Sequence, residues 1–173
     1  MALQRLTIDG YGQLEINFFT APRDGQIEAQ CKLNETDFAE MPAEVGMLLA
    51  VDNINRRVKL PVAGEPYPIA INYSTEHMYD EREMALKNFK LDKNTFCPRL
   101  GYIGVADKFT TNTVCYDDAA AINTYKYGKA CAEEGFEGYI ELTNTREGAH
   151  VEVLDANTTM PDGQAAVKFG GLN

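Results

Sequence analysis

Residues that usually carry chemistry are scarce in this sequence of 173 residues. It has no tryptophan and only two histidines, His77 and His150, which lie far apart in the chain. Two distant histidines do not have the spacing of a metal site. No two of the four cysteines form a C-x-x-C pair, so a zinc ribbon is not expected; they are Cys31, Cys97, Cys115 and Cys131.

Positive charge is also in short supply. Lys and Arg number 16 against 26 Asp and Glu, which gives a net charge of −10 at pH 7. Nucleic acids and anionic membranes both attract Lys and Arg, so we expect neither as a partner. No apolar run approaches the roughly 20 residues that a membrane-spanning helix needs. The first residues lack the apolar core of a secretion signal, so we expect folding in a cytoplasm, with reduced cysteines.

No nucleophile stands beside a base in the sequence. Cys97 precedes a proline, Cys115 falls within an expected strand, and neither has the context of a catalytic thiol. Asp117 and Asp118 are adjacent, and adjacent side chains on an extended chain point to opposite faces. We therefore expect no enzymatic activity, no metal and no cofactor.

What the sequence has in abundance is alternating polarity with β-branched residues, most clearly in the central stretch 96–117. Two strands are expected there, 99–105 and 109–116, joined by a turn into a hairpin. Nine or ten such short strands recur along the chain. This spacing predicts a mainly β fold, an antiparallel sandwich or a small barrel. Aspartates before three alanines predict one short helix, a helical insertion near 118–132.

Two turns are predicted from their residue types. Asp52-Asn53-Ile54-Asn55 separates the apolar run 45–51 from residues 57–60, which predicts a second hairpin. Met160-Pro161-Asp162-Gly163 has Pro and Gly at the positions where a β-turn favours them.

The first 36 residues form a block of their own. Residues 3–33 predict a small meander of strands, and residues 34–43 are polar and turn-rich, as in a linker. An isolated meander buries too little apolar area to be stable, so it has to pack on its own domain or on another chain. We therefore divide the chain into an N-terminal β meander or extension (1–36) and a β-rich main domain (37–173).

Three residues of the meander are candidate assembly contacts. Phe18 and Phe19 are adjacent, so one of them points away from the face that buries the other. Ile27 lies on the apolar side of the next expected strand. An exposed Phe is better explained by a partner, and the alternative is that both Phe residues pack inside one two-layer domain. If the exposed Phe contacts a partner, a chain that starts at Asp37 should fold but should not assemble.

Several runs of strand and turn residues stand out in the middle of the chain and near its end. They are VGMLLAVD (45–52), VKLP (58–61), NYSTE (72–76), LKNFKL (86–91), PRLGY (98–102), DKFTTNT (107–113) and MPDG (160–163). Together these runs resemble small structural proteins of tailed bacteriophages that infect Gram-positive gut bacteria. The pattern differs at one point, because Ala106 stands where a glycine is expected before Asp107.

The resemblance implies a head decoration protein, also called an auxiliary or cement protein, on the exterior of the phage capsid. It implies synthesis in the bacterial host cytoplasm, the major capsid protein as a partner, and a homo-oligomer, with a trimer as the expected form. One alternative is a tail or head–tail connector protein. Another, from a different class, is a carbohydrate-binding or hydrolytic β-domain. The aromatic pair Tyr125 and Tyr127 favours sugar binding, and the lack of tryptophan disfavours it.

Overall fold

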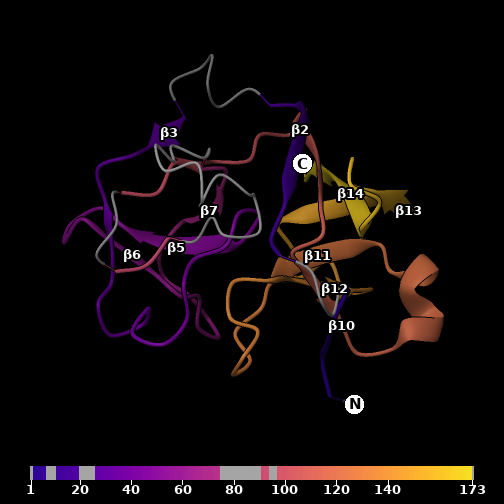
Figure 1. Cartoon of the computed structure of the whole chain (residues 1–173), viewed down its shortest axis with the longest axis horizontal. Coiled ribbons are helices and arrows are strands. Elements are labelled where there is room, and N and C mark those ends of the chain that lie inside the picture. Colours follow the sequence, from indigo (N-terminus) through magenta and orange to yellow (C-terminus); the bar gives the residue numbers. More distant parts are fainter. Residues whose placement is uncertain (1, 7–10, 20–25, 75–90, 94–96, 173) are drawn as a thin grey trace.

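The computed structural model describes residues 2–6, 11–19, 26–74, 91–93 and 97–172. These residues form a mainly β structure, in which they build two sheets in a sandwich-like arrangement and one short helix, and this confirms the expected fold class (Figure 1). The described strands do not form a closed barrel. In Figure 1 one sheet lies around β5, β6 and β7 on the left, and the other around β10 to β14 on the right.

The larger sheet has eight strands. Its strand order is β1-β10-β12-β11-β13-β14-β9-β2. Every neighbouring pair is antiparallel except β10 and β12, so the sheet is mixed. The strands are β1 (Gln4–Arg5), β2 (Leu14–Phe18), β9 (Lys108–Thr111), β10 (Val114–Tyr116), β11 (Tyr127–Ala130), β12 (Ile140–Thr143), β13 (Val151–Thr159) and β14 (Ala165–Gly171).

The smaller sheet has six strands in the order β3-β8-β7-β5-β6-β4. It too is mixed, because β4 and β6 are parallel and the other pairs antiparallel. The predicted hairpin is confirmed as β5 and β6, and the Asp52 carboxylate closes its turn by accepting a hydrogen bond from Asn55 N at 3.0 Å. The strands are β3 (Ile27–Glu28), β4 (Lys32–Leu33), β5 (Leu48–Asp52), β6 (Arg57–Lys59), β7 (Ile69–Asn72) and β8 (Leu100–Gly101).

The predicted central hairpin is wrong, because its two halves lie in different sheets. β8 belongs to the six-stranded sheet and β9 to the eight-stranded sheet. The chain crosses between them at residues 102–107, where the buried Asp107 carboxylate accepts a hydrogen bond from Gly104 N at 2.7 Å. The backbone oxygen of Asp107 also accepts a hydrogen bond from Gly171 N, which ties the crossing to the end of β14.

The predicted strand 109–116 is also broken. It ends as β9 at Thr111 and resumes as β10 at Val114, with Asn112 and Thr113 between them. β9 is second from one end of the eight-stranded sheet and β10 is second from the other end. Only two residues separate these strands, so the sheet has to curl until its two ends approach one another.

The four N-terminal strands are the outermost strands of both sheets. β1 and β2 form the two edges of the larger sheet, and β3 and β4 form the two edges of the smaller one. Their partners are β10, β9, β8 and β6, all distant in sequence. Within the described ranges none of the four pairs with another, so the predicted meander pairing is wrong. In Figure 1 β2 lies in the middle of the molecule and β3 lies apart from it, at the upper left.

The predicted helical insertion is much shorter than expected. A 3₁₀-helix, η2 (Ala119–Thr124), begins after Asp118, whose carboxylate caps it by accepting a hydrogen bond from Ala120 N at 2.9 Å. The expected continuation toward residue 132 is wrong because 127–130 form β11. Gly128 allows β11 to pack closely against its neighbours, because a Cβ atom at this position would lie only 2.9 Å from Val151 Cγ2.

Two apolar cores lie on either side of β5. Leu49 and Val51 of β5 belong to the first core, and Leu48 belongs to the second. The second core fills the curled eight-stranded sheet with Phe109, Phe169 and neighbouring aliphatic residues. The N-terminal segment enters both cores: it supplies Cys31 and Leu33 to the first and Phe19 to the second.

Candidate functional site

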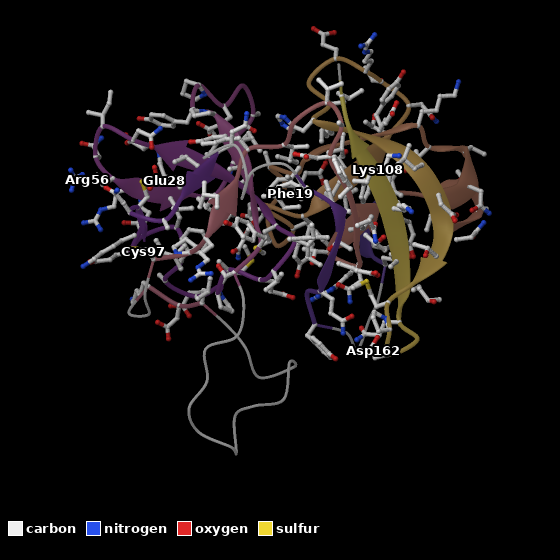
Figure 2. The ribbon with its side chains drawn as sticks, turned by 90° about the horizontal axis from the view of Figure 1, so that it is seen from above. Phe19, Glu28, Arg56, Cys97, Lys108 and Asp162 are labelled. Carbon is white, nitrogen blue, oxygen red and sulfur yellow. The ribbon has the colours of Figure 1, made fainter. Side chains whose placement is uncertain are left out.

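Phe18 and Phe19 lie at the end of β2 and face opposite ways. Phe19 is 7% exposed and lies in the second core, its ring centroid 5.9 Å from that of Tyr73. Figure 2 shows Phe19 in the middle of the molecule, between the two sheets. Phe18 is 45% exposed and is paired with Lys108 of β9. A bulge between Ile16 and Phe18 shifts the alternation, so Phe19 and not Phe18 continues the core side of the strand.

Ile27 is 38% exposed on β3, the edge strand of the smaller sheet. Its partner is Gly101, and the chain that follows Gly101 leads to Lys108, the partner of Phe18. Val105 lies on this connection and is also exposed. We call Phe18, Ile27 and Val105 the rim residues. Of the three expected assembly contacts, Phe18 and Ile27 are accessible to a partner and Phe19 is buried.

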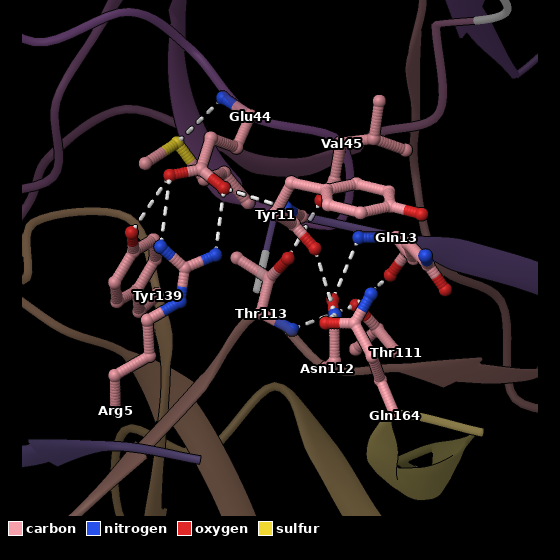
Figure 3. Close-up of polar contacts among 12 residues, drawn as sticks. Arg5, Tyr11, Gln13, Glu44, Val45, Thr111, Asn112, Thr113, Tyr139 and Gln164 are labelled. Atoms are coloured by element: carbon pink, nitrogen blue, oxygen red, sulfur yellow. Dashed lines mark hydrogen bonds and ion pairs between the residues drawn. The ribbon is translucent and has the colours of Figure 1, made fainter. Parts of the chain in front are cut away.

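A polar cluster centred on Glu44 joins the N-terminal segment to the body (Figure 3). The Glu44 carboxylate accepts hydrogen bonds from Arg5 Nη2 at 2.8 Å, Gly12 N at 2.6 Å and the Tyr139 hydroxyl at 2.9 Å. The Arg5 guanidinium also lies over the Tyr139 ring, 5.1 Å from its centroid. Burial and the nearby Glu44 carboxylate raise the pKa of Tyr139, which keeps its hydroxyl a donor.

The break between β9 and β10 is held by side chains. The buried Asn112 accepts a hydrogen bond from Gln13 N and donates one to the Tyr11 oxygen, each at 2.7 Å. Thr111 donates to the Gln13 oxygen, and Thr113 donates to the Val45 oxygen at 2.7 Å. At the break, these side-chain hydrogen bonds take the place of the strand-to-strand backbone hydrogen bonds. The break between β9 and β10 is therefore held in a defined conformation.

Asp162, in the turn between β13 and β14, makes a second polar contact with the N-terminal segment. Its carboxylate accepts hydrogen bonds from Gln164 Nε2 at 2.7 Å, Gln13 Nε2 at 2.7 Å and the Tyr11 hydroxyl at 2.9 Å. These hydrogen bonds hold the pKa of Asp162 well below its usual value, and the one from Gln164 has the largest effect. The predicted turn is confirmed, with Gly163 at positive φ and its N–H donating to the Met160 oxygen.

The cysteines are all free thiols. Cys115 and Cys131 are buried side by side, and the hydrogen bond between their sulfurs together with burial raises the pKa of Cys115. Burial raises the pKa of Cys31 to about 11. A catalytic thiol needs a lowered pKa, so the environments of Cys31 and Cys115 suit packing rather than nucleophilic attack. The hydrogen bond with Cys115 lowers the pKa of Cys131, but this thiol is fully buried and has no path to a substrate, so its environment suits packing as well. Burial also lowers the pKa of His150. His77 lies outside the described residues.

Two of the hollows on the described surface are large enough to consider as sites. The larger, of about 850 Å³, lies between the proline-rich loop 61–69 and strands β11 and β12, and contains the ion pair of Lys129 and Glu141 at 3.1 Å. The smaller, of about 470 Å³, lies along β2. Among the described residues no three His, Cys, Asp or Glu side chains are grouped to hold a metal ion. None of the helices described is long and apolar enough to cross a membrane.

The alternation of polarity does not reveal the polar cluster. Glu44 falls in a turn-rich stretch and its partner Tyr139 is 95 positions away, so no local pattern signals their contact. In comparisons with known proteins, no family model, curated protein or solved structure matches the chain.

Proposed function

We propose that this chain is a non-enzymatic structural protein of a virus particle, a decoration protein on the exterior of a tailed-phage head. The observation that carries the proposal is the placement of the rim residues. Phe18 and Ile27 are exposed apolar side chains on outermost strands, and Val105 lies on the connection between their partner strands. Apolar side chains presented in this way favour contact with another protein.

The kind of particle follows from the resemblance to small phage structural proteins. The runs that carry it coincide with strands that build the fold, since 45–52 contains β5, 98–102 contains β8 and 107–113 contains β9. The partner is the major capsid protein, and copies of the chain contact one another in a homo-oligomer, for which we expect a trimer. A net charge of −10 repels copies at long range, so these contacts have to come from apolar burial.

One observation bears on the carbohydrate-binding alternative. The Tyr125 hydroxyl donates a hydrogen bond to the Asp117 carboxylate, and the ring packs against the second core. A sugar platform needs an open ring face, and the packing of Tyr125 leaves less of its ring available. The structural role is therefore the better supported proposal.

The test is to find the chain in the particle. Virions of the phage that encodes it are purified and disrupted, heads are separated from tails, and peptides of the chain are quantified by mass spectrometry. We expect it in the head fraction, at a fixed ratio to the major capsid protein. Recovery with the tails selects the tail or connector alternative. If both fractions lack the chain, the virion role is rejected and a glycan array becomes the next experiment.

A further inference from the structure

The smaller hollow runs along Leu14–Ile16 of β2, at the edge of the larger sheet. Its volume, about 470 Å³, is in the range of sites that hold small ligands or side chains. Leu14 and Ile16 lie on the core-facing side of β2, and Val45, Tyr73 and Met160 complete an apolar floor. The described residues that line it include two carboxylates, Glu15 and Asp162, and no lysine or arginine.

β2 is the last strand of the larger sheet. In the part of the chain that the structure describes, its one ladder partner is β9, so its outer backbone groups face away from the sheet. The strand alternates until the bulge: Leu14 and Ile16 share a face with Thr111 and Phe109, and Glu15 lies on the opposite face, across from Thr110, at the border of the hollow. An edge strand with unpaired backbone groups is a template for another strand.

We propose that β2 and this hollow bind an extended segment of a different protein by strand addition. Backbone hydrogen bonds to β2 hold such a segment, and its alternate side chains enter the adjacent hollow. The apolar floor calls for aliphatic side chains at these alternate positions. Between them, a Lys or Arg directly across from Glu15 forms a favourable cross-strand charge pair. The segment therefore has the pattern apolar–basic–apolar.

Charge argues against a second copy of the chain as the occupant. Each copy has a net charge of −10, and the hollow itself has only acidic charges among its described lining residues. A basic segment is attracted to this site, whereas another acidic copy is repelled. Binding of such a segment to β2 is separate from the proposed virion role, because it needs no phage particle.

The probe is a synthetic peptide, Thr-Val-Lys-Val-Lys-Val-Thr, with blocked ends. It is titrated into the full-length protein labelled with ¹⁵N, and amide shifts are followed by NMR. We expect saturable shifts in residues 11–18, 45, 73–74 and 160–162. Two control peptides keep the same length: one has Glu in place of both Lys residues, and one has Pro at the central Val. We expect neither to bind, because the first is repelled and the second lacks a ladder N–H.

Two variants sharpen the test. Glu15→Lys should bind the Lys peptide roughly five- to tenfold more weakly and should now accept the Glu peptide, because a cross-strand attraction becomes a repulsion. Glu147→Lys makes the same change of net charge at an exposed turn and should bind as the unmodified protein does. Ile16→Thr should weaken binding of the Lys peptide, whereas Ile54→Thr, at a side chain 90% exposed in another turn, should not.

Several results would overturn the proposal. They are shifts elsewhere on the protein, equal binding of the Pro peptide, and a Glu15→Lys variant indistinguishable from Glu147→Lys. A dimer that forms through β2 without any peptide, seen by sedimentation, would assign the site to a second copy and reject the occupant proposed.

Discussion

Glu44 connects three segments that are far apart in the chain: the segment of Arg5 and Gly12, its own turn, and the region of Tyr139. The Glu44 and Arg5 side chains are largely buried, 18% and 20% exposed. We expect Glu44→Gln to lower the free energy of unfolding by about 2–4 kcal/mol, because it leaves a largely buried guanidinium without its charge partner. Urea denaturation followed by circular dichroism measures this.

The control is a second ion pair among the described residues, Lys129 with Glu141. Its Lys129 side chain is 40% exposed, and exposed pairs contribute about 0–1 kcal/mol. Glu141→Gln, which leaves only the exposed Lys129 side chain without its partner, should therefore cost much less than Glu44→Gln. If the two variants lose the same stability, Glu44 is an ordinary surface carboxylate and the polar cluster does not hold the N-terminal segment.

Asp162 gives the protein a sensitivity to acid. Its folded-state pKa lies below the ordinary value of 3.8, because hydrogen bonds from Gln164, Gln13 and Tyr11 favour the ionised form. A carboxyl with a depressed pKa stabilises the fold above its unfolded pKa, and this stabilisation is lost as the pH falls toward the folded value. We expect urea midpoints to fall between pH 5 and pH 2.5, and to fall less in Asp162→Asn.

Asp155→Asn is the matched control on the same hairpin, where the carboxylate accepts a hydrogen bond from Asn157 N at 2.9 Å. It should keep the acid sensitivity of the unmodified protein. An Asp162→Asn variant with an unchanged dependence on pH would show that these hydrogen bonds do not favour the ionised form.

At the scale of elements, the turn before β5 fits against the break between β9 and β10. Gly46 has φ of 90°, and a side chain there would collide with the Thr111 hydroxyl and lie 2.9 Å from that of Thr113. Gly64 also has positive φ, but no atom lies within 4 Å of its added Cβ. We expect Gly46→Ala to cost about 1–3 kcal/mol more than Gly64→Ala, because only the first adds overpacking to backbone strain.

Thermal unfolding of the two variants side by side measures this difference. Equal loss of stability would mean that positive φ alone matters and that the turn is not packed against the break.

Local residue chemistry predicted some elements correctly. The hairpin of β5 and β6 follows from an apolar run and a turn whose Asp52 hydrogen bonds lie within the turn itself. The break at Asn112 and Thr113 could not be predicted in the same way. Both residues continue the alternation of polarity, and Asn112 is held by Gln13, 99 positions earlier. A strand that ends because of a distant partner leaves no local signal.

The edge strands show the same limit. The alternation in residues 3–33 predicted strands there, but not their number or their partners. Neighbouring strands usually pair, and these do not. The phase of Phe18 and Phe19 depends on a bulge that the sequence pattern does not mark. The sequence therefore identified two accessible candidate contacts, Phe18 and Ile27, and could not show which of the two Phe residues is buried.

At the scale of the whole molecule, the first 36 residues are part of both sheets and both cores. Removing them takes the edge strands from β6, β8, β9 and β10 and takes Phe19 and Leu33 from the cores. In contrast to the expectation from sequence alone, we therefore expect a chain that starts at Asp37 not to unfold cooperatively in a calorimeter. A chain that starts at Leu3 should unfold as the full-length protein does.

A cooperative transition in the chain that starts at Asp37 would contradict this view. It would show that the N-terminal segment is an extension on a self-sufficient domain, and that its strands can be given up without loss of either core.

The measurement that tests the central claim most directly is binding of the purified protein to phage shells that lack it, followed by co-sedimentation. We expect the unmodified protein to saturate the shells. Phe18→Asp should reduce the affinity at least about tenfold, as loss of a buried aromatic contact does. Ile54→Asp introduces the same charge at a more exposed apolar residue, in the turn between β5 and β6, and should bind normally. Both variants should melt as the unmodified protein does. Shells that leave the unmodified protein in solution, or that bind Phe18→Asp equally well, would contradict the account.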